Sequence, residues 1–286
     1  MADKNQKTFA GFNDVSIRAD VYGDNHERPV LFAHGGGQTR HAWRQTGRLL
    51  AEQGCQSFCI DLRGHGESDW SKGGDYGIDM FAEDLLCICD QLEFPPVLVG
   101  ASLGGIAAMV AAGDLRPGVF SALIFVDVTP HLEPTGVDKI VGFMGEHLAE
   151  GFGSLEEAAD VIADYLPNRP KRKNLSGLEK NLRKGDDGRY RWHWDPQFIK
   201  GLYSPTTVRD PLWLSHAVEK IDVPILLVRG QMSELVSEES VRQFLELRPD
   251  AKFVDVAKAG HMVAGDHNDA FTAAIADFLS HDLGWK

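Results

Sequence analysis

The sequence has few basic residues for its length: 29 Lys and Arg stand against 42 Asp and Glu, which gives a formal net charge of −13. Surfaces that bind nucleic acid are rich in Lys and Arg because they neutralise phosphates, so this balance argues against a nucleic-acid partner. Apolar residues are not scarce, at 43%, and this content is typical of a globular protein and excludes a disordered chain.

Long apolar runs are also missing. The first eight residues contain no apolar region of the kind found in a signal peptide. The longest uncharged stretch is Phe94–Gly113, and its two prolines and four glycines favour a strand, a turn and a helix over a membrane span. We therefore expect no contact with a membrane.

Cysteine is rare, with Cys55, Cys59, Cys87 and Cys89 as its four positions. Cys87 and Cys89 lie two residues apart in an expected helix and face different sides, which suits neither a disulfide nor a zinc site. Buried thiols are typical of the reducing cytosol, so we expect a cytoplasmic protein without a bound metal.

Short apolar runs alternate with helical patterns along most of the chain. Strands are expected at residues 15–21, 30–33, 57–60, 97–99, 123–126, 225–228 and 252–256, and helices at 42–53, 80–92, 106–112 and 269–279. Such alternation is typical of βαβ units, in which helices cover both faces of a parallel sheet. The sequence therefore predicts an α/β fold.

This alternation stops between Pro130 and Ser215, where helical patterns continue but no run is typical of a strand. We expect a core domain formed by residues 1–130 and 216–286, interrupted by a helical cap domain formed by residues 131–215. Within this cap, Arg169–Arg191 has nine basic and three acidic residues.

A candidate nucleophile lies in Gly100-Ala-Ser102-Leu-Gly104, between an expected strand and an expected helix. A serine on such a tight turn needs small neighbours, and the glycines two residues before and after it provide them. The helix that follows favours negative charge developing at its N-terminus. We predict Ser102 as a nucleophile, against the alternative of a glycine-rich turn with an inert serine.

A serine hydroxyl needs a base and an acid to become a nucleophile. His261 follows the last expected strand, on the side of a parallel sheet where Ser102 is expected, and we predict it as the base. Glu234 and Asp127 each follow an apolar strand and are the candidate acids. We favour Glu234 because the chain order Ser102, Glu234, His261 then matches the order expected of this layout.

Acyl transfer also needs donors for the oxyanion. His34-Gly-Gly-Gly37 follows the first buried strand, and glycine lets backbone N–H groups approach a ligand closely. We predict the N–H groups of Gly36 and Leu103 as the two donors, and a structural role for His34.

Together these motifs resemble those of the α/β-hydrolase fold family, in particular its capped serine esterases and lipase-like hydrolases. The matching segments are His34–Gly37, Asp61–Ser68, Gly100–Gly104 and Gly260-His261. The resemblance implies a mostly parallel central sheet flanked by helices, with a helical cap that selects the substrate and with no cofactor. It also implies that Asp61–Ser68 is structural, with Arg63 and His65 tying loops together.

Two details qualify this resemblance. The acid of the family is more often Asp, three residues after the glycine that ends its strand, whereas Glu234 lies four residues after Gly230. Relatives that open epoxides or remove halides carry Asp at the nucleophile position, so Ser102 points to acyl chemistry instead.

Aromatic residues gather in the cap, in Arg189-Tyr-Arg-Trp192-His-Trp194. If Tyr190, Trp192 and Trp194 alternate along an extended segment, they share one face. Trp192 and Trp194 are candidate substrate-binding residues above Ser102, and the alternative is that they only fix the cap to the core.

The sequence thus predicts a serine hydrolase that cleaves small carboxylic esters through an acyl-enzyme intermediate. A lactonase or a C–C bond hydrolase with the same triad is the alternative, and a small-molecule receptor on the same fold is a third possibility. Both a monomer and a homodimer are compatible with the sequence.

Overall fold

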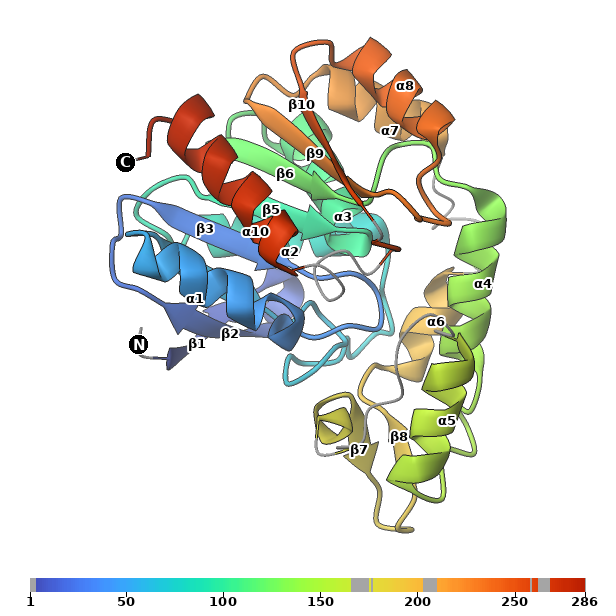
Figure 1. Ribbon diagram of the computed structural model, residues 1–286. Coiled ribbons are helices and arrows are strands. Elements are labelled where there is room, and N and C mark those ends of the chain that lie inside the picture. Colours follow the sequence, from blue (N-terminus) through green and yellow to red (C-terminus); the bar gives the residue numbers. More distant parts are fainter. Residues whose placement is uncertain are drawn as a thin grey trace.

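The computed structural model describes residues 4–165, 175, 177–202, 210–257, 259–261 and 268–285. Its centre is an eight-stranded sheet with the order β1-β2-β4-β3-β5-β6-β9-β10 (Figure 1). The strands are β1 (Lys4–Ala10), β2 (Ser16–Tyr22), β3 (Pro29–Ala33), β4 (Gln56–Ile60), β5 (Val97–Ala101), β6 (Ala122–Val126), β9 (Ile225–Gly230) and β10 (Lys252–Val256). β2 pairs antiparallel with both β1 and β4, and the other pairs are parallel, which confirms the predicted α/β fold.

Helices cover both faces of this sheet, as alternate side chains of the central strands require. Leu31 and Leu98 face the apolar cluster beneath the helices α2 (Ile78–Cys89), α3 (Leu103–Val110), α7 (Pro211–Glu219) and α8 (Glu238–Leu247). Phe32 and Val99 face the opposite cluster beneath α1 (Arg44–Glu52) and α10 (Asn268–Asp277). Four single-turn helices lie between or after these elements: η1 (Phe12–Asp14), η2 (Arg40–Trp43), η3 (Ala111–Leu115) and η6 (Phe278–Asp282).

The edge strand β1 is absent from the sequence-based expectations. Of its described side chains only Phe9 is buried, so the strand lacks the apolar alternation that marks a strand in a sequence. It is held by its antiparallel pairing with β2 instead.

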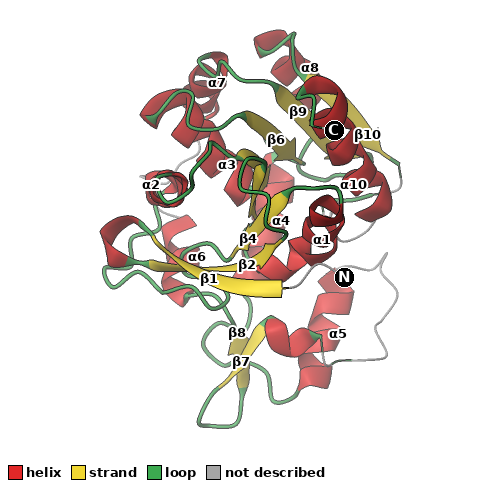
Figure 2. Ribbon diagram, turned by 90° about the vertical axis from the view of Figure 1, so that its left-hand side faces the viewer, coloured by secondary structure: helices red, strands yellow, loops and turns green. Residues whose placement is uncertain are grey.

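The chain from α4 to α6, between β6 and β9, forms a separate layer outside the sheet (Figures 1 and 2). It contains α4 (Pro134–Gly145), α5 (Leu155–Tyr165), η4 (Leu178–Lys180), β7 (Leu182–Lys184), β8 (Tyr190–Trp192) and α6 (Pro196–Leu202). Beside the expected helices this region has a strand pair that the sequence did not indicate, because β7 and β8 pair antiparallel, with Leu182 opposite Trp192. Strands of three residues are too short to produce an alternating run.

The last helix before β9, α7, packs on the core helix α3 rather than in the cap. A Cβ atom on Gly113 would lie 2.0 Å from the carbonyl oxygen of Ala217, so the two segments approach closely. The expected boundary at residues 215 and 216 therefore falls inside α7.

No disulfide joins the four cysteines, all of which lie in the described part of the chain. Among the helices described, none combines the length and the apolar character that crossing a membrane requires.

Candidate active site

Ser102 lies between β5 and α3 on a backbone with φ 44° and ψ −112°. A positive φ is costly for a residue with a side chain, and such strain often marks a functional position. The turn requires its glycines: a Cβ on Gly100 would lie 2.7 Å from Cα of Gly105, and a Cβ on Gly104 would lie 2.5 Å from the carbonyl oxygen of Ala33. The predicted strand–turn–helix around Ser102 is therefore present.

Gly104→Ala is expected to destabilise the protein, because its new methyl group would collide with the Ala33 backbone. Overpacking of this kind costs about 1–3 kcal/mol in free energy of unfolding. Gly142→Ala is the matched control, since a Cβ at this position in α4 meets nothing within 4 Å. It should stabilise α4 by about 0.5–1 kcal/mol. Urea unfolding measures both, and an unchanged midpoint for Gly104→Ala would refute the close approach.

The strand register places Ser102 and Asp127 side by side. Ala101 pairs with Val126 between the parallel strands β5 and β6, and each candidate residue comes directly after its strand. The N–H of Ser102 donates to the Val126 carbonyl at 3.3 Å, and the N–H of Asp127 donates to the Val228 carbonyl at 2.7 Å. Both residues therefore lie at the carboxyl edge of the sheet, where sites of this kind of fold form.

His261 is bound to Asp127 and not to Glu234. Its Nδ1 lies 2.7 Å from Oδ2 of Asp127, whose side chain is fully buried at the end of β6. Since an ionised carboxylate only accepts, Nδ1 carries a hydrogen, and in the neutral imidazole Nε2 is then the unprotonated nitrogen that a general base needs. The His261 side chain is 20% exposed, so its ring is accessible at the surface of the core.

Two further donors hold the Asp127 carboxylate. The N–H of Gly230 donates to Oδ1 at 3.0 Å, and the hydroxyl of Ser233 donates to Oδ2 at 2.6 Å. Ser233 is the third residue after Gly230, the position at which the resemblance places the usual acid. Sequence reasoning missed this serine, and its position relative to Gly230 was the only signal that could have found it.

The structure does not bring Glu234, the acid predicted from chain order, to His261. Its side chain is 62% exposed, and its two carboxylate oxygens lie 2.8 and 2.7 Å from Nζ of Lys139 on α4. Chain order favoured this residue, but the side chain leaves the loop toward the cap. Asp127, the alternative acid in the sequence, has the contact with His261.

The glycine loop after β3 lies against Ser102, since a Cβ on Gly35 would be 3.3 Å from Cβ of the serine. The N–H groups of Gly35 and Gly37 donate to Gln38 Oε1 at 3.2 Å and His65 Nε2 at 3.1 Å. For the N–H of Gly36 no acceptor exists among the described residues. This amide is thus available to a ligand.

Leu103, the other predicted donor, is the first residue of α3. Its neighbours are engaged, because the N–H of Ser102 donates to Val126 and that of Gly104 to the His34 carbonyl at 3.2 Å. In the described part of the chain no acceptor faces the N–H of Leu103. Such amides at a helix N-terminus are well suited to bind an anion.

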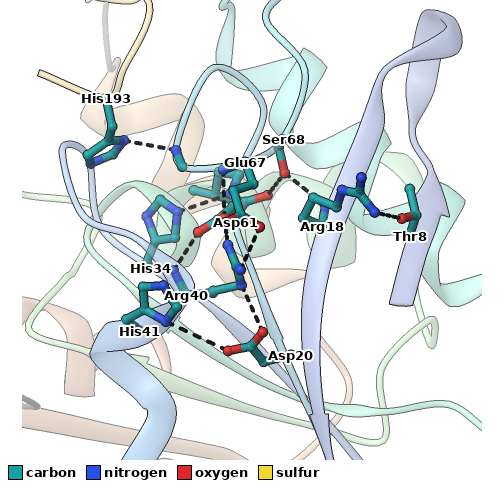
Figure 3. Close-up of polar contacts among 12 residues, drawn as sticks. Thr8, Arg18, Asp20, His34, Arg40, His41, Asp61, Glu67, Ser68 and His193 are labelled. Carbon is teal, nitrogen blue, oxygen red and sulfur yellow. Dashed lines mark hydrogen bonds and ion pairs between the residues drawn. The ribbon is translucent and has the colours of Figure 1, made fainter. Parts of the chain in front are cut away.

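Two buried imidazoles support this loop in their neutral form. Nδ1 of His34 donates to the Gly35 carbonyl at 2.7 Å while Nε2 accepts from the N–H of Leu62 at 3.0 Å (Figure 3). Nδ1 of His65 donates to the Arg63 carbonyl at 2.9 Å while Nε2 accepts from Gly37. Burial lowers the pKa of His34 to about 4 and that of His65 to about 3. Structural roles for both, as predicted, agree with these contacts.

The cap aromatics are buried and stacked. The rings of Trp192 and Trp194 are 4.8 Å apart at 11°, and Trp192 also meets Phe143 and Phe152 inside the cap. The position of Trp192 agrees with the alternative that this residue packs inside the protein and does not bind substrate. Trp194 reaches further, because a Cβ on Gly37 would lie 3.4 Å from its ring. Trp194 thus adjoins the glycine loop.

Comparisons with known proteins agree with this architecture. Residues 28–159 match the family model described as alpha/beta hydrolase fold. The chain is 30% identical over 261 residues to Esterase Rv0045c of Mycobacterium tuberculosis, covering 87% of this chain and 82% of that protein. It is 27% identical over 241 residues to a 3-hydroxybutyrate-oligomer hydrolase of Cupriavidus necator, covering 77% and 80%.

Solved structures give the same result. The crystal structure of E-2-(acetamidomethylene)succinate hydrolase superposes with a TM-score of 0.82 at 24% identity and covers 97% of this chain and 99% of its own. The crystal structure of Esterase Rv0045c superposes with a TM-score of 0.76 at 25% identity, covering 98% and 91%. These structures therefore share the fold described above. The chain belongs to the α/β hydrolase fold family, which confirms the predicted resemblance.

Proposed function

We propose that this protein is a serine hydrolase that cleaves carboxylic esters through an acyl-enzyme intermediate. The observation that carries the proposal is the 2.7 Å contact between His261 Nδ1 and Asp127, which follows β6, the strand next to the one that leads into the strained turn of Ser102. The similarity to an esterase over most of the chain supports the same reaction.

In the proposed mechanism, Oγ of Ser102 attacks the ester carbonyl and Nε2 of His261 takes the hydroxyl proton. Asp127 fixes the tautomer of His261 and stabilises the imidazolium. The N–H groups of Gly36 and Leu103 stabilise the oxyanion of the tetrahedral intermediate. His261 then protonates the leaving alcohol, and water repeats the sequence on the acyl-enzyme.

A hydrolase of carboxylate-bearing compounds is the second candidate, because one structural relative is named for an acetamidomethylene succinate. Such a substrate calls for a free cation above Ser102. The arginines described in the basic stretch of the cap are engaged with protein groups: Arg183 donates to the Gly66 carbonyl, Arg189 to the Gly151 carbonyl, and Arg191 to Asp187. These three arginines therefore already have protein partners and give no support to a carboxylate-bearing substrate.

The test uses a fluorophosphonate probe, which reacts covalently with activated serines, and short p-nitrophenyl esters. We expect one adduct per chain, located at Ser102 by peptide mass spectrometry, together with ester turnover. Ser102→Ala is the control and should show neither. Labelling without turnover would favour the receptor alternative, and no labelling of the folded protein would refute the assignment of Ser102.

We also propose the domain organisation expected from the sequence, with a core, residues 1–130 and 216–286, and a cap, residues 131–215. The packing of α7 on α3 favours moving the second boundary to Asp210, which caps α7.

We further propose a cytoplasmic location, a small-molecule substrate and a monomeric or homodimeric state, as expected from the sequence.

A further inference from the structure

The peptide group between Gly37 and Gln38 connects the cap to the oxyanion loop. Its carbonyl oxygen lies 3.2 Å from Nε2 of His193, which follows β8 in the cap. Its N–H, that of Gln38, donates to the Gly35 carbonyl at 3.1 Å. The Gly35 carbonyl belongs to the same peptide group as the N–H of Gly36, the proposed oxyanion donor. Two hydrogen bonds therefore connect the side chain of His193 in the cap with the peptide group that contains the Gly36 N–H.

A loop of three successive glycines needs such external support. Glycine has the greatest backbone freedom of any residue, and Gly37 adopts φ 75°. His34, Gln38 and His65 support the loop from the core side. His193 is the hydrogen-bonding side chain that reaches the loop from the cap among the residues described.

The contacts of His193 determine which of its nitrogens carries the hydrogen. The ring of His193 (Figure 3) is 2% exposed. Its Nδ1 lies 2.8 Å from the N–H of Gly66, so Nδ1 accepts and Nε2 donates to Gly37. Burial, together with the imidazoles of His65 and His34, lowers the pKa of His193 well below its usual value. The ring is therefore neutral, with its single hydrogen directed at the Gly37 carbonyl.

We propose that His193 is a positioning residue for the oxyanion hole. Its hydrogen bond to the Gly37 carbonyl holds the peptide that in turn orients the Gly36 amide. Docking of the cap and the geometry of the oxyanion hole are thereby coupled. This inference rests on the proposed function, because it assigns His193 a part in stabilising the intermediate formed on Ser102.

Two substitutions separate the two hydrogen bonds of His193. The amide nitrogen of Gln reaches the position of Nε2, so His193→Gln keeps the donor to Gly37 and loses the acceptor for Gly66. The amide of Asn reaches only the position of Nδ1, so His193→Asn keeps the contact with Gly66 and loses the one with Gly37. A merely structural role in fixing the cap would affect the two variants alike.

The expected result is a kcat for p-nitrophenyl acetate that falls about tenfold in His193→Asn, with KM within about threefold, and a kcat near the wild-type value in His193→Gln. Loss of an entire oxyanion donor costs about 10²–10³ in kcat, and loss of its support should cost less. The inhibition constant of phenylboronic acid, which forms a tetrahedral adduct with serine, should rise by the same factor as kcat falls. Arg191→Ala, on the exposed side of the same hairpin, is the control for general disturbance of the cap.

Equal kcat values in the Asn and Gln variants would overturn the inference and leave the proposed function intact. A wild-type protein that neither hydrolyses the ester nor binds the boronic acid would overturn both. If the Asn variant does not fold, His193→Met, which keeps neither hydrogen bond, takes its place against His193→Gln with the same two outcomes.

Discussion

Asp127→Asn is expected to lower kcat for ester hydrolysis by about four orders of magnitude, whereas Glu234→Gln should leave it within about twofold. His261 Nδ1, Ser233 Oγ and Gly230 N–H all donate to the Asp127 carboxylate. An amide cannot accept at its nitrogen, so Asn stabilises the tautomer of His261 with the hydrogen on Nε2. That tautomer cannot take the proton of Ser102.

Initial rates with p-nitrophenyl acetate, together with the rate of fluorophosphonate labelling, measure the effect. The Glu234 variant is the matched control because it removes a carboxylate from the loop that also contains Ser233. Glu234 forms only an exposed ion pair with Lys139, and such pairs contribute about 0–1 kcal/mol. If Glu234→Gln lost as much activity as Asp127→Asn, the acid would be Glu234 after all.

The pattern of the sequence was sufficient for the fold, and it singled out Ser102 and His261 as candidates for the site. Buried strands leave apolar runs, and the geometry of the Ser102 turn demands glycines at fixed positions, so both are visible in the sequence. The identity of the acid was not visible in the sequence. Asp127 and Glu234 both come after a strand, and the sequence does not show which side chain points toward His261. That direction is decided by tertiary contacts, namely Ser233 on one side and Lys139 on the other.

The role of His193 could not be predicted for a related reason. Its partners are backbone groups of Gly37 and Gly66, which lie 156 and 127 residues away in the sequence. Almost any residue at those two positions would offer the same backbone groups. A side chain that binds backbone leaves no complementary residue in the sequence. The aromatic pattern around it indicated an extended segment but not what that segment would contact.

Below the oxyanion loop, one buried cation holds three segments of the core together (Figure 3). The guanidinium of Arg40 binds Asp20 on β2 at 3.0 Å, Asp61 after β4, and Glu67 at 2.7 Å. The side chains of Arg40, Asp20 and Asp61 are all at least 97% buried. Asp61 also accepts from the N–H groups of Arg40 and Glu67, so its charge organises the Asp61–Ser68 loop.

Arg40→Met is therefore expected to lower the free energy of unfolding by about 3–5 kcal/mol, because it leaves two buried carboxylates without their cation. Arg242→Met is the control: Arg242 binds Glu239 and Glu246 but is 58% exposed, so its loss should leave the unfolding midpoint nearly unchanged. Urea unfolding followed by tryptophan fluorescence measures both.

Since the penalty arises from uncompensated charge, adding Asp61→Asn to Arg40→Met should recover part of the stability, although Asp61→Asn alone is destabilising. Additive losses in the double variant would show that Arg40 acts through packing rather than through charge.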